Sequence, residues 1–274
     1  MSDLPLTRPL TRESMASAAI RRGVLFYAET WIRYIRVYAL SLGLVAVVQP
    51  LLYLVAMGVG LGALVRGDVA GVSYLRFVAP AIMVSTMTAA AMGEFSYNIT
   101  GGFLWNKGFF APNQTPIQPR QIAGGVIVAC CLRFTIQCLI FWAMMVAFGA
   151  VDSALSLLSV PISLLCALAF GLPLMAYTAQ MKREHGQLNL VQRFIVMPLS
   201  LFSGTYFLLE TMPGYLQWIG WVSPIWHATQ LARVVCFGLV EPGWLIVTHV
   251  AYLVALALLG WVLAMRFFER RLRD

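Results

Sequence analysis

Long apolar segments separated by short polar intervals dominate the pattern of this chain. An α-helix needs roughly 20 predominantly apolar residues to cross a bilayer. Six segments approach or exceed that length, at residues 37–64, 74–97, 121–148, 154–179, 190–209 and 244–265. The pattern therefore predicts an all-α polytopic membrane protein with six transmembrane helices.

A different pattern precedes the first span. The first eleven residues are polar and contain two prolines, which predicts an irregular cytoplasmic tail. In residues 12–36 charged and apolar side chains fall on separate helical faces, and Glu29 stands four residues before Arg33. A basic helix with aromatic residues on its apolar side is suited to the headgroup plane. We expect a tail and an amphipathic interfacial helix over 1–36, and a transmembrane domain over 37–274. The alternative is a simple helical extension of the first span.

The stretch between the last two spans is apolar but broken. Pro213, Pro224, His227 and Arg233 interrupt it. Irregular backbone at membrane depth is tolerated only where protein or a cavity covers it. We therefore expect a re-entrant helical hairpin over residues 210–240, which dips into the outer face and returns.

Composition agrees with a membrane protein and limits the alternatives. Of the 274 residues, 60% are hydrophobic and 11% are charged, whereas a soluble domain carries roughly 25% charged residues. The net charge of +8 lies in short loops and at the termini, beside apolar spans, so it does not indicate a nucleic-acid partner. The five cysteines and three histidines show no metal-ligand spacing, and no nucleophile–base set can be argued. We expect neither a metal site nor a catalytic site.

Charge also predicts the orientation in the plasma (inner) membrane. With both termini cytoplasmic, the inner pieces hold fifteen of the nineteen basic residues, and the outer pieces hold Arg66, Arg76 and Arg233. This is the expected positive-inside bias. If the broken stretch crossed the membrane, the C-terminal arginines would face outward, so we expect it to return to the outer face.

Arg133 is the one charge deep within an expected span. Intramembrane charges often mark a substrate or ion pathway, which makes Arg133 a candidate for the substrate path. The alternative is a structural arginine satisfied by neighbouring polar groups such as Gln137. Glu94 lies nearer the cytoplasmic end of its span, at a different expected depth. No set of groups for a proton relay is apparent.

ATP hydrolysis within the chain is excluded because a P-loop requires Gly-Lys-Ser/Thr. The two lysines are followed by Gly108 and Arg183. If energy is used, a separate subunit must supply it, and that subunit needs a cytoplasmic docking surface. The turn-rich interval 98–121 is one candidate, and 181–189 is another. The residues that we expect to couple to an ATPase are Trp105, Lys107, Phe109, Phe110 and Arg120. Alternatively, the aromatic rings touch only lipid.

Two motifs resemble the ABC-2 type transporter permeases, in particular the nodulation-factor exporter type. The first is Gln49-Pro50-Leu51-Leu52-Tyr53-Leu54, followed by Gly58-Val59-Gly60-Leu61-Gly62 and Gly71-Val72-Ser73-Tyr74-Leu75. The second comprises Ser203-Gly204, Pro213, Ser223-Pro224, His227, Arg233 and Gly238. The resemblance covers the chain from about Val37 to the C-terminus. Drug-resistance and polysaccharide exporters belong to the same superfamily.

The resemblance implies partners as well as a fold. It implies six spans, a second permease copy (identical or different), and two separate ATPase subunits that carry ATP and magnesium. It places a coupling helix in residues 98–121 and two short re-entrant helices before the last span. Relatives usually carry an acidic residue early in the coupling segment, where this chain has Asn106-Lys107, so the ATPase contact is expected to differ.

The predicted function is that of a permease subunit without ATPase activity of its own, within an ATP-hydrolysing translocase. The resemblance favours outward export of an amphipathic substrate, such as a glycolipid or lipid-linked saccharide, across the plasma membrane, with membrane lipid as a further partner. The first alternative is a multidrug or antibiotic efflux permease. The second, from another class, is an ATP-independent channel or carrier.

The resemblance also gives the re-entrant segment a role at the exit of the pathway. The candidate gate residues are Tyr206, Phe207, Tyr215, Trp218, Trp221 and Trp226. Their rings would close the outer gate or stack on sugars. The alternative is an aromatic belt at the membrane boundary that only anchors the protein.

Overall fold

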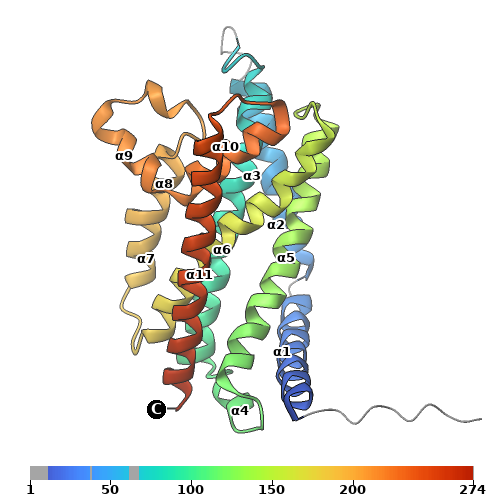
Figure 1. Ribbon diagram of the computed structural model, residues 1–274, viewed down its shortest axis with the longest axis vertical. Helices are drawn as coiled ribbons and strands as arrows, with labels where there is room; N and C mark the ends of the chain where they lie inside the picture. Colours follow the sequence, from blue (N-terminus) through green and yellow to red (C-terminus); the bar gives the residue numbers. More distant parts are fainter. Residues whose placement is uncertain (1–11, 38, 62–67, 274) are drawn as a thin grey trace, which may run out of the picture.

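The computed structural model describes residues 12–37, 39–61 and 68–273, and these residues form a helical bundle without strands (Figure 1). The predicted tail and the end of the first expected span lie outside the described residues. The α-helices are α1 (Arg12–Val37), α2 (Ala39–Tyr53), α3 (Tyr74–Met92), α4 (Phe110–Asn113), α5 (Pro119–Ala147), α6 (Ser159–Gln180), α7 (Gln187–Val191), α8 (Met197–Phe202), α9 (Gly214–Val222), α10 (Pro224–Phe237) and α11 (Gly243–Arg273). The π-helical segments are η1 (Leu54–Leu61), η2 (Gly93–Asn98), η3 (Gly101–Trp105) and η5 (Gln192–Val196), and the 3-10 helices are η4 (Ala154–Leu158) and η6 (Leu209–Thr211).

Four continuous helical stretches of the described chain are long and apolar enough to cross a membrane. They run over Tyr74–Trp105, Pro119–Ala147, Ala154–Gln180 and Gly243–Arg273. These stretches correspond to the second, third, fourth and sixth expected spans. Shorter elements occupy the other two positions: α2 with η1 at the first, and α7, η5 and α8 at the fifth. The chain is therefore an all-α membrane-embedded protein.

The second expected span continues farther than the sequence suggested. Beyond α3, the chain remains helical through η2 and η3 as far as Trp105. Gly102 lies in this extension, and a Cβ atom there would meet the Phe109 ring at 2.2 Å. The glycine pair at 101–102 therefore serves close packing within a helix rather than a turn. The polar connection to α5 is reduced to residues 106–118, which include α4.

The bundle is centred on α6, which packs along α11 and α3. Glycine permits the closest approaches between these helices. A Cβ at Gly260 of α11 would lie 2.4 Å from Pro173 Cδ, and one at Gly171 of α6 would lie 2.2 Å from the Phe95 ring. Such contacts bring membrane helices together where the bilayer offers little hydrophobic driving force between them.

Helix α1 packs on the first part of α5. Its aromatic side chains Tyr27 and Trp31 are buried, and a Cβ at Gly125 of α5 would lie 2.8 Å from Tyr27 Cβ. The predicted Glu29–Arg33 ion pair is present at 2.7 Å on the exposed face. Tyr27 and Trp31 thus contact protein, whereas Ile20 and Phe26 of the same helix are exposed.

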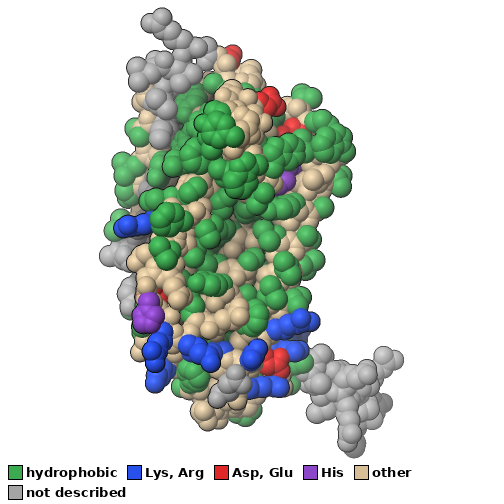
Figure 2. All heavy atoms as spheres, turned by 90° about the vertical axis from the view of Figure 1, so that its left-hand side faces the viewer, with side chains coloured by type: hydrophobic (Ala, Val, Ile, Leu, Met, Phe, Trp, Pro, Cys, Tyr) green, Lys and Arg blue, Asp and Glu red, His purple; other side chains and the backbone are tan. Residues whose placement is uncertain are grey.

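The ends of the bundle differ in charge. Helix α4, the start of α1 and the C-terminus lie at one end, and α9 and α10 lie towards the other (Figure 1). On the face in Figure 2, Lys and Arg side chains gather in a band at the end with the C-terminus. This is the distribution that the charge pattern predicts for a cytoplasmic end.

Candidate functional site

The predicted coupling segment forms a compact turn at the basic end. Trp105 ends η3 with its side chain 62% exposed. Lys107 follows in the left-handed region, with φ +53, and is also exposed. A cavity of about 230 Å³ is lined by Trp105, Tyr27 and Asn98, among others. Trp105 and Lys107 therefore both lie on the surface at this end.

Phe109, which we expected to be a water-facing anchor, is instead fully buried. Its ring stacks on Trp31 of α1, with centroids 5.9 Å apart and planes at 15°. It also lies 4.8 Å from the Phe103 ring and 5.4 Å from the Phe268 ring of α11. Phe110 is half-buried. Phe109 therefore packs the turn against α1 and α11.

Polar contacts also fasten the turn to α11. Arg120 Nε lies 2.7 Å from Glu269 Oε2. The Asn113 amide donates to the Leu272 carbonyl at 2.7 Å. Arg120 itself remains largely exposed, so the ion pair contributes modestly to stability. Together with the Phe109 packing, these contacts make the turn and the end of α11 one unit.

Arg133 forms an ion pair with Glu94, and the Asn98 amide donates to the same carboxylate at 2.8 Å. Gln137, the polar neighbour expected to satisfy Arg133, is buried one turn farther along α5, and the partner of the guanidinium is Glu94 instead. The sequence placed Glu94 and Arg133 at different depths because the second span was expected to end at residue 97. Continuation of the helix to Trp105 places Glu94 well inside the bundle, beside Arg133.

Arg233 organises the opposite end, although the sequence marked it only as a motif residue and an interruption. Its side chain is 1% exposed. It donates to the carbonyls of Phe77 at 3.3 Å, Gly204 at 2.8 Å and Thr205 at 3.3 Å. It also lies 3.7 Å from the centroid of the Phe77 ring. The left-handed φ of +67 at Gly204 gives the chain its bend here. Arg233 thus holds α10 and the bend at Gly204 against α3.

A hydrogen-bond chain joins α10 to α11. His227 Nε2 lies 3.0 Å from the Trp221 carbonyl, which can only accept, so this nitrogen carries hydrogen. Burial lowers the pKa of His227, which lies outside the four long apolar helices, and this favours the neutral ring. Its Nδ1 then accepts from His249 Nδ1 at 2.6 Å. His249 Nε2 lies 3.1 Å from Glu241 Oε2, and this contact requires one proton. The sequence did not predict this series of hydrogen bonds, because the residues that form it are distant from one another in the sequence.

The predicted gate aromatics have unequal environments. Tyr215 and Trp218 are exposed at 75% and 62%, Trp221 is half-exposed, and Trp226 is buried against Trp221 with centroids 4.7 Å apart. Tyr206 is half-buried, and its carbonyl accepts from the Tyr74 hydroxyl at 3.3 Å. Phe207 is exposed. A cavity of about 370 Å³ adjoins Trp221 and Trp226 and is also lined by Gln217, Gln230, Glu210 and Glu241.

The sequence of this helical chain matches a known family of membrane transport proteins. The family model for ABC-2 type transporters matches residues 24–237, so the chain belongs to this family. Proteins of this family are transport subunits that work with ABC ATPase partners. The resemblance inferred from the two sequence motifs is thereby confirmed.

Among the relatives are proteins called nodulation protein J. The one from Rhizobium meliloti (strain 1021) is 25% identical over 82% of this chain and 84% of its own length. That from Rhizobium leguminosarum bv. trifolii is 26% identical over 82% of this chain and 84% of its own. That from Rhizobium leguminosarum bv. viciae is 24% identical over 94% of this chain and 99% of its own. The likeness therefore extends over most of both chains.

Proposed function

We propose that the chain is the membrane-spanning permease subunit of an ABC exporter that moves an amphipathic substrate outward. A separate ATPase subunit, present in two copies, powers the movement and holds ATP and magnesium. The observation that carries this proposal is the turn at residues 106–118. The turn and the adjoining end of η3 present Lys107 and Trp105 outward, and Phe109 packs the turn onto α1 and α11.

The mechanism follows from this packing. A partner that closes against Trp105 displaces the turn. Because Phe109 is wedged between Trp31 and Phe268, the displacement passes to α1 and α11 rather than being absorbed by a flexible loop. Helix α11 also carries His249, which is bonded to the re-entrant segment. Movement of α11 is thus communicated to the opposite end.

The proposed topology has six spans, both termini in the cytoplasm, and the re-entrant hairpin α9–α10 at the outer face of the plasma membrane. The basic band at the end with the C-terminus supports this orientation. Two permease copies, identical or different, form the pathway. Tyr206, Phe207, Tyr215, Trp218, Trp221 and Trp226 form the exit gate, and Arg133 lies along the substrate path.

A glycolipid or lipid-linked saccharide is the proposed substrate class, by analogy with the nodulation-factor exporter type. The cavity beside Trp221 supports this class, because aromatic rings, amides and carboxylates together suit a polyhydroxylated headgroup. A hydrophobic drug is the second candidate, favoured by the exposed rings of Tyr215 and Trp218.

Affinity purification from the native membrane tests the proposal. The tagged chain should retain a P-loop ATPase, and Trp105→Ala should reduce that retention while Trp218→Leu, at the opposite end, should not. Failure to recover any P-loop ATPase, together with indifference to nucleotide, would instead favour the ATP-independent channel or carrier.

A further inference from the structure

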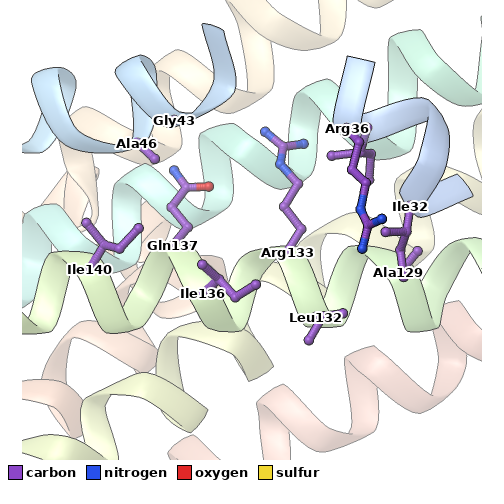
Figure 3. A pocket seen from close by; sticks show the side chains of 11 residues that line it. Ile32, Arg36, Gly43, Ala46, Ala129, Leu132, Arg133, Ile136, Gln137 and Ile140 are labelled. Atoms are coloured by element: carbon purple, nitrogen blue, oxygen red, sulfur yellow. The ribbon is translucent and has the colours of Figure 1, made fainter. Parts of the chain in front are cut away.

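A groove on the membrane-facing side of the bundle runs between α5 and the junction of α1 with α2. Its volume is about 350 Å³, at the lower end of the range for ligand sites. Its walls are apolar apart from two arginines and one amide (Figure 3). Its polar lining residues are Arg36, Arg133 and Gln137, and its apolar ones include Gly43, Ala46 and Ile136.

The two arginines enter the groove from different helices. Figure 3 shows Arg36 reaching from the end of α1 towards Ala129 and Leu132 of α5, and Arg133 rising from α5 itself. Glu94 balances the charge of Arg133. Arg36 is exposed and has no acidic partner among the residues that the structure describes. The groove therefore has a net positive charge at the arginine end.

The residues around the groove indicate that it faces lipid rather than water. Leu132 and Ile136 are about half exposed on the outer face of α5, which is one of the four long apolar helices. Such a surface faces lipid. A guanidinium beside hydrocarbon is costly unless an anion or water compensates it. The groove thus combines a demand for an anion with walls suited to an acyl chain.

We propose that this groove binds one anionic membrane phospholipid, with its phosphate on Arg36 and an acyl chain along α5. Arginine suits phosphate because its planar donors form bidentate hydrogen bonds. The acyl chain lies against Ile136 and Ile140, opposite Ala46. Gly43 leaves that side open, since a Cβ there would meet nothing within 4 Å. Basic pockets between helices bind anionic headgroups in this way.

The positive charge of the groove favours an anionic lipid over a second copy of the chain or a zwitterionic lipid. A second copy of the chain would place another apolar helix over the groove and leave Arg36 without an anion, whereas a zwitterionic lipid would bring a cation along with its phosphate. The proposal does not rest on the export function, because a resident lipid is retained whether or not the protein transports.

Native mass spectrometry of the full chain, released from nanodiscs of equal phosphatidylglycerol and phosphatidylcholine, tests the proposal. The wild type should retain phosphatidylglycerol in preference. Arg36→Gln should lower that preference about fivefold, since one arginine near the lipid surface contributes on that scale. Arg33→Gln is the matched control. It lies on the same helix, is exposed and is paired with Glu29, and it should leave the preference unchanged.

A second variant, Gly43→Leu, fills the groove without touching either arginine. It should reduce retention of both lipids, and its unchanged melting temperature would show that the bundle remains folded. Equal retention of the two lipids by the wild type would overturn the proposal. So would equal effects of Arg36→Gln and Arg33→Gln, or a dimer that covers the groove and carries no lipid.

Discussion

The two ends of the bundle bury opposite kinds of side chain. At the basic end the aromatic rings are inside: Phe103, Phe109 and Phe268 form a buried cluster, while the basic side chains lie on the surface. At the other end the polar groups are inside. Arg233 and His249 are buried, whereas the rings of Tyr215 and Trp218 are exposed.

This difference assigns a mechanical role to each end. Buried rings lose their van der Waals contacts when they separate. The basic end should therefore resist deformation and transmit movement. Hydrogen bonds such as those of Arg233 and His227 exchange for bonds to water when they open, at a smaller net cost. Under the proposed function, the end with buried polar groups is therefore the one that we expect to open.

The largest expected effect comes from removing the centre of the aromatic cluster. Phe109→Ala should destabilise the protein by about 3–5 kcal/mol, because the space left among Trp31, Phe103 and Phe268 cannot collapse fully. Thermal unfolding in detergent measures this. Phe110→Ala, at a half-buried neighbour, should cost clearly less, and equal losses would refute the buried role of Phe109.

A smaller loss is expected at the opposite end. Arg233→Met keeps much of the side-chain volume but leaves the carbonyls of Phe77 and Gly204 without a donor, which costs about 1–3 kcal/mol. The control is Arg76→Met, because Arg76 makes a half-exposed ion pair with Asp152 worth at most about 1 kcal/mol. If both variants unfold at the same temperature, Arg233 does not hold this end together.

Trp105→Ala should separate coupling from stability. The ring is mostly exposed, so the melting temperature should barely change, within about 0.5 kcal/mol of the wild type. Transport driven by the partner should nevertheless fall, with membrane insertion unaffected. Phe109 is unsuitable for this experiment because its removal unfolds the turn. Unchanged transport would exclude the turn from the mechanism.

The smallest effect on stability is expected from the paired change Trp218→Leu and Trp221→Leu. Both rings have large exposed fractions, and leucine preserves an apolar surface. If the rings gate the exit, transport leaks or stalls, and this is the outcome we expect. Normal transport would show that they serve only as an anchor at the membrane boundary. Flux measurements in vesicles distinguish the two.

The sequence predicted the class and the long helices well, because apolar length is a local property. The errors arose where a local sequence pattern is explained by a contact with a distant part of the chain. The glycines at 101–102 resemble a turn, yet they make room for the Phe109 ring within a helix. Ending that helix early also separated Glu94 from Arg133, which are paired. The His227–His249 contact joins residues 22 apart on two helices, so no spacing rule could reveal it.

The most direct test of the central claim is transport in proteoliposomes that contain this chain with and without the ATPase recovered from its native membrane. A glycolipid is the first substrate to use. The account predicts no sustained outward transport by the chain alone, and transport when the ATPase, ATP and magnesium are all present. Sustained transport by the chain alone, without nucleotide, would contradict it.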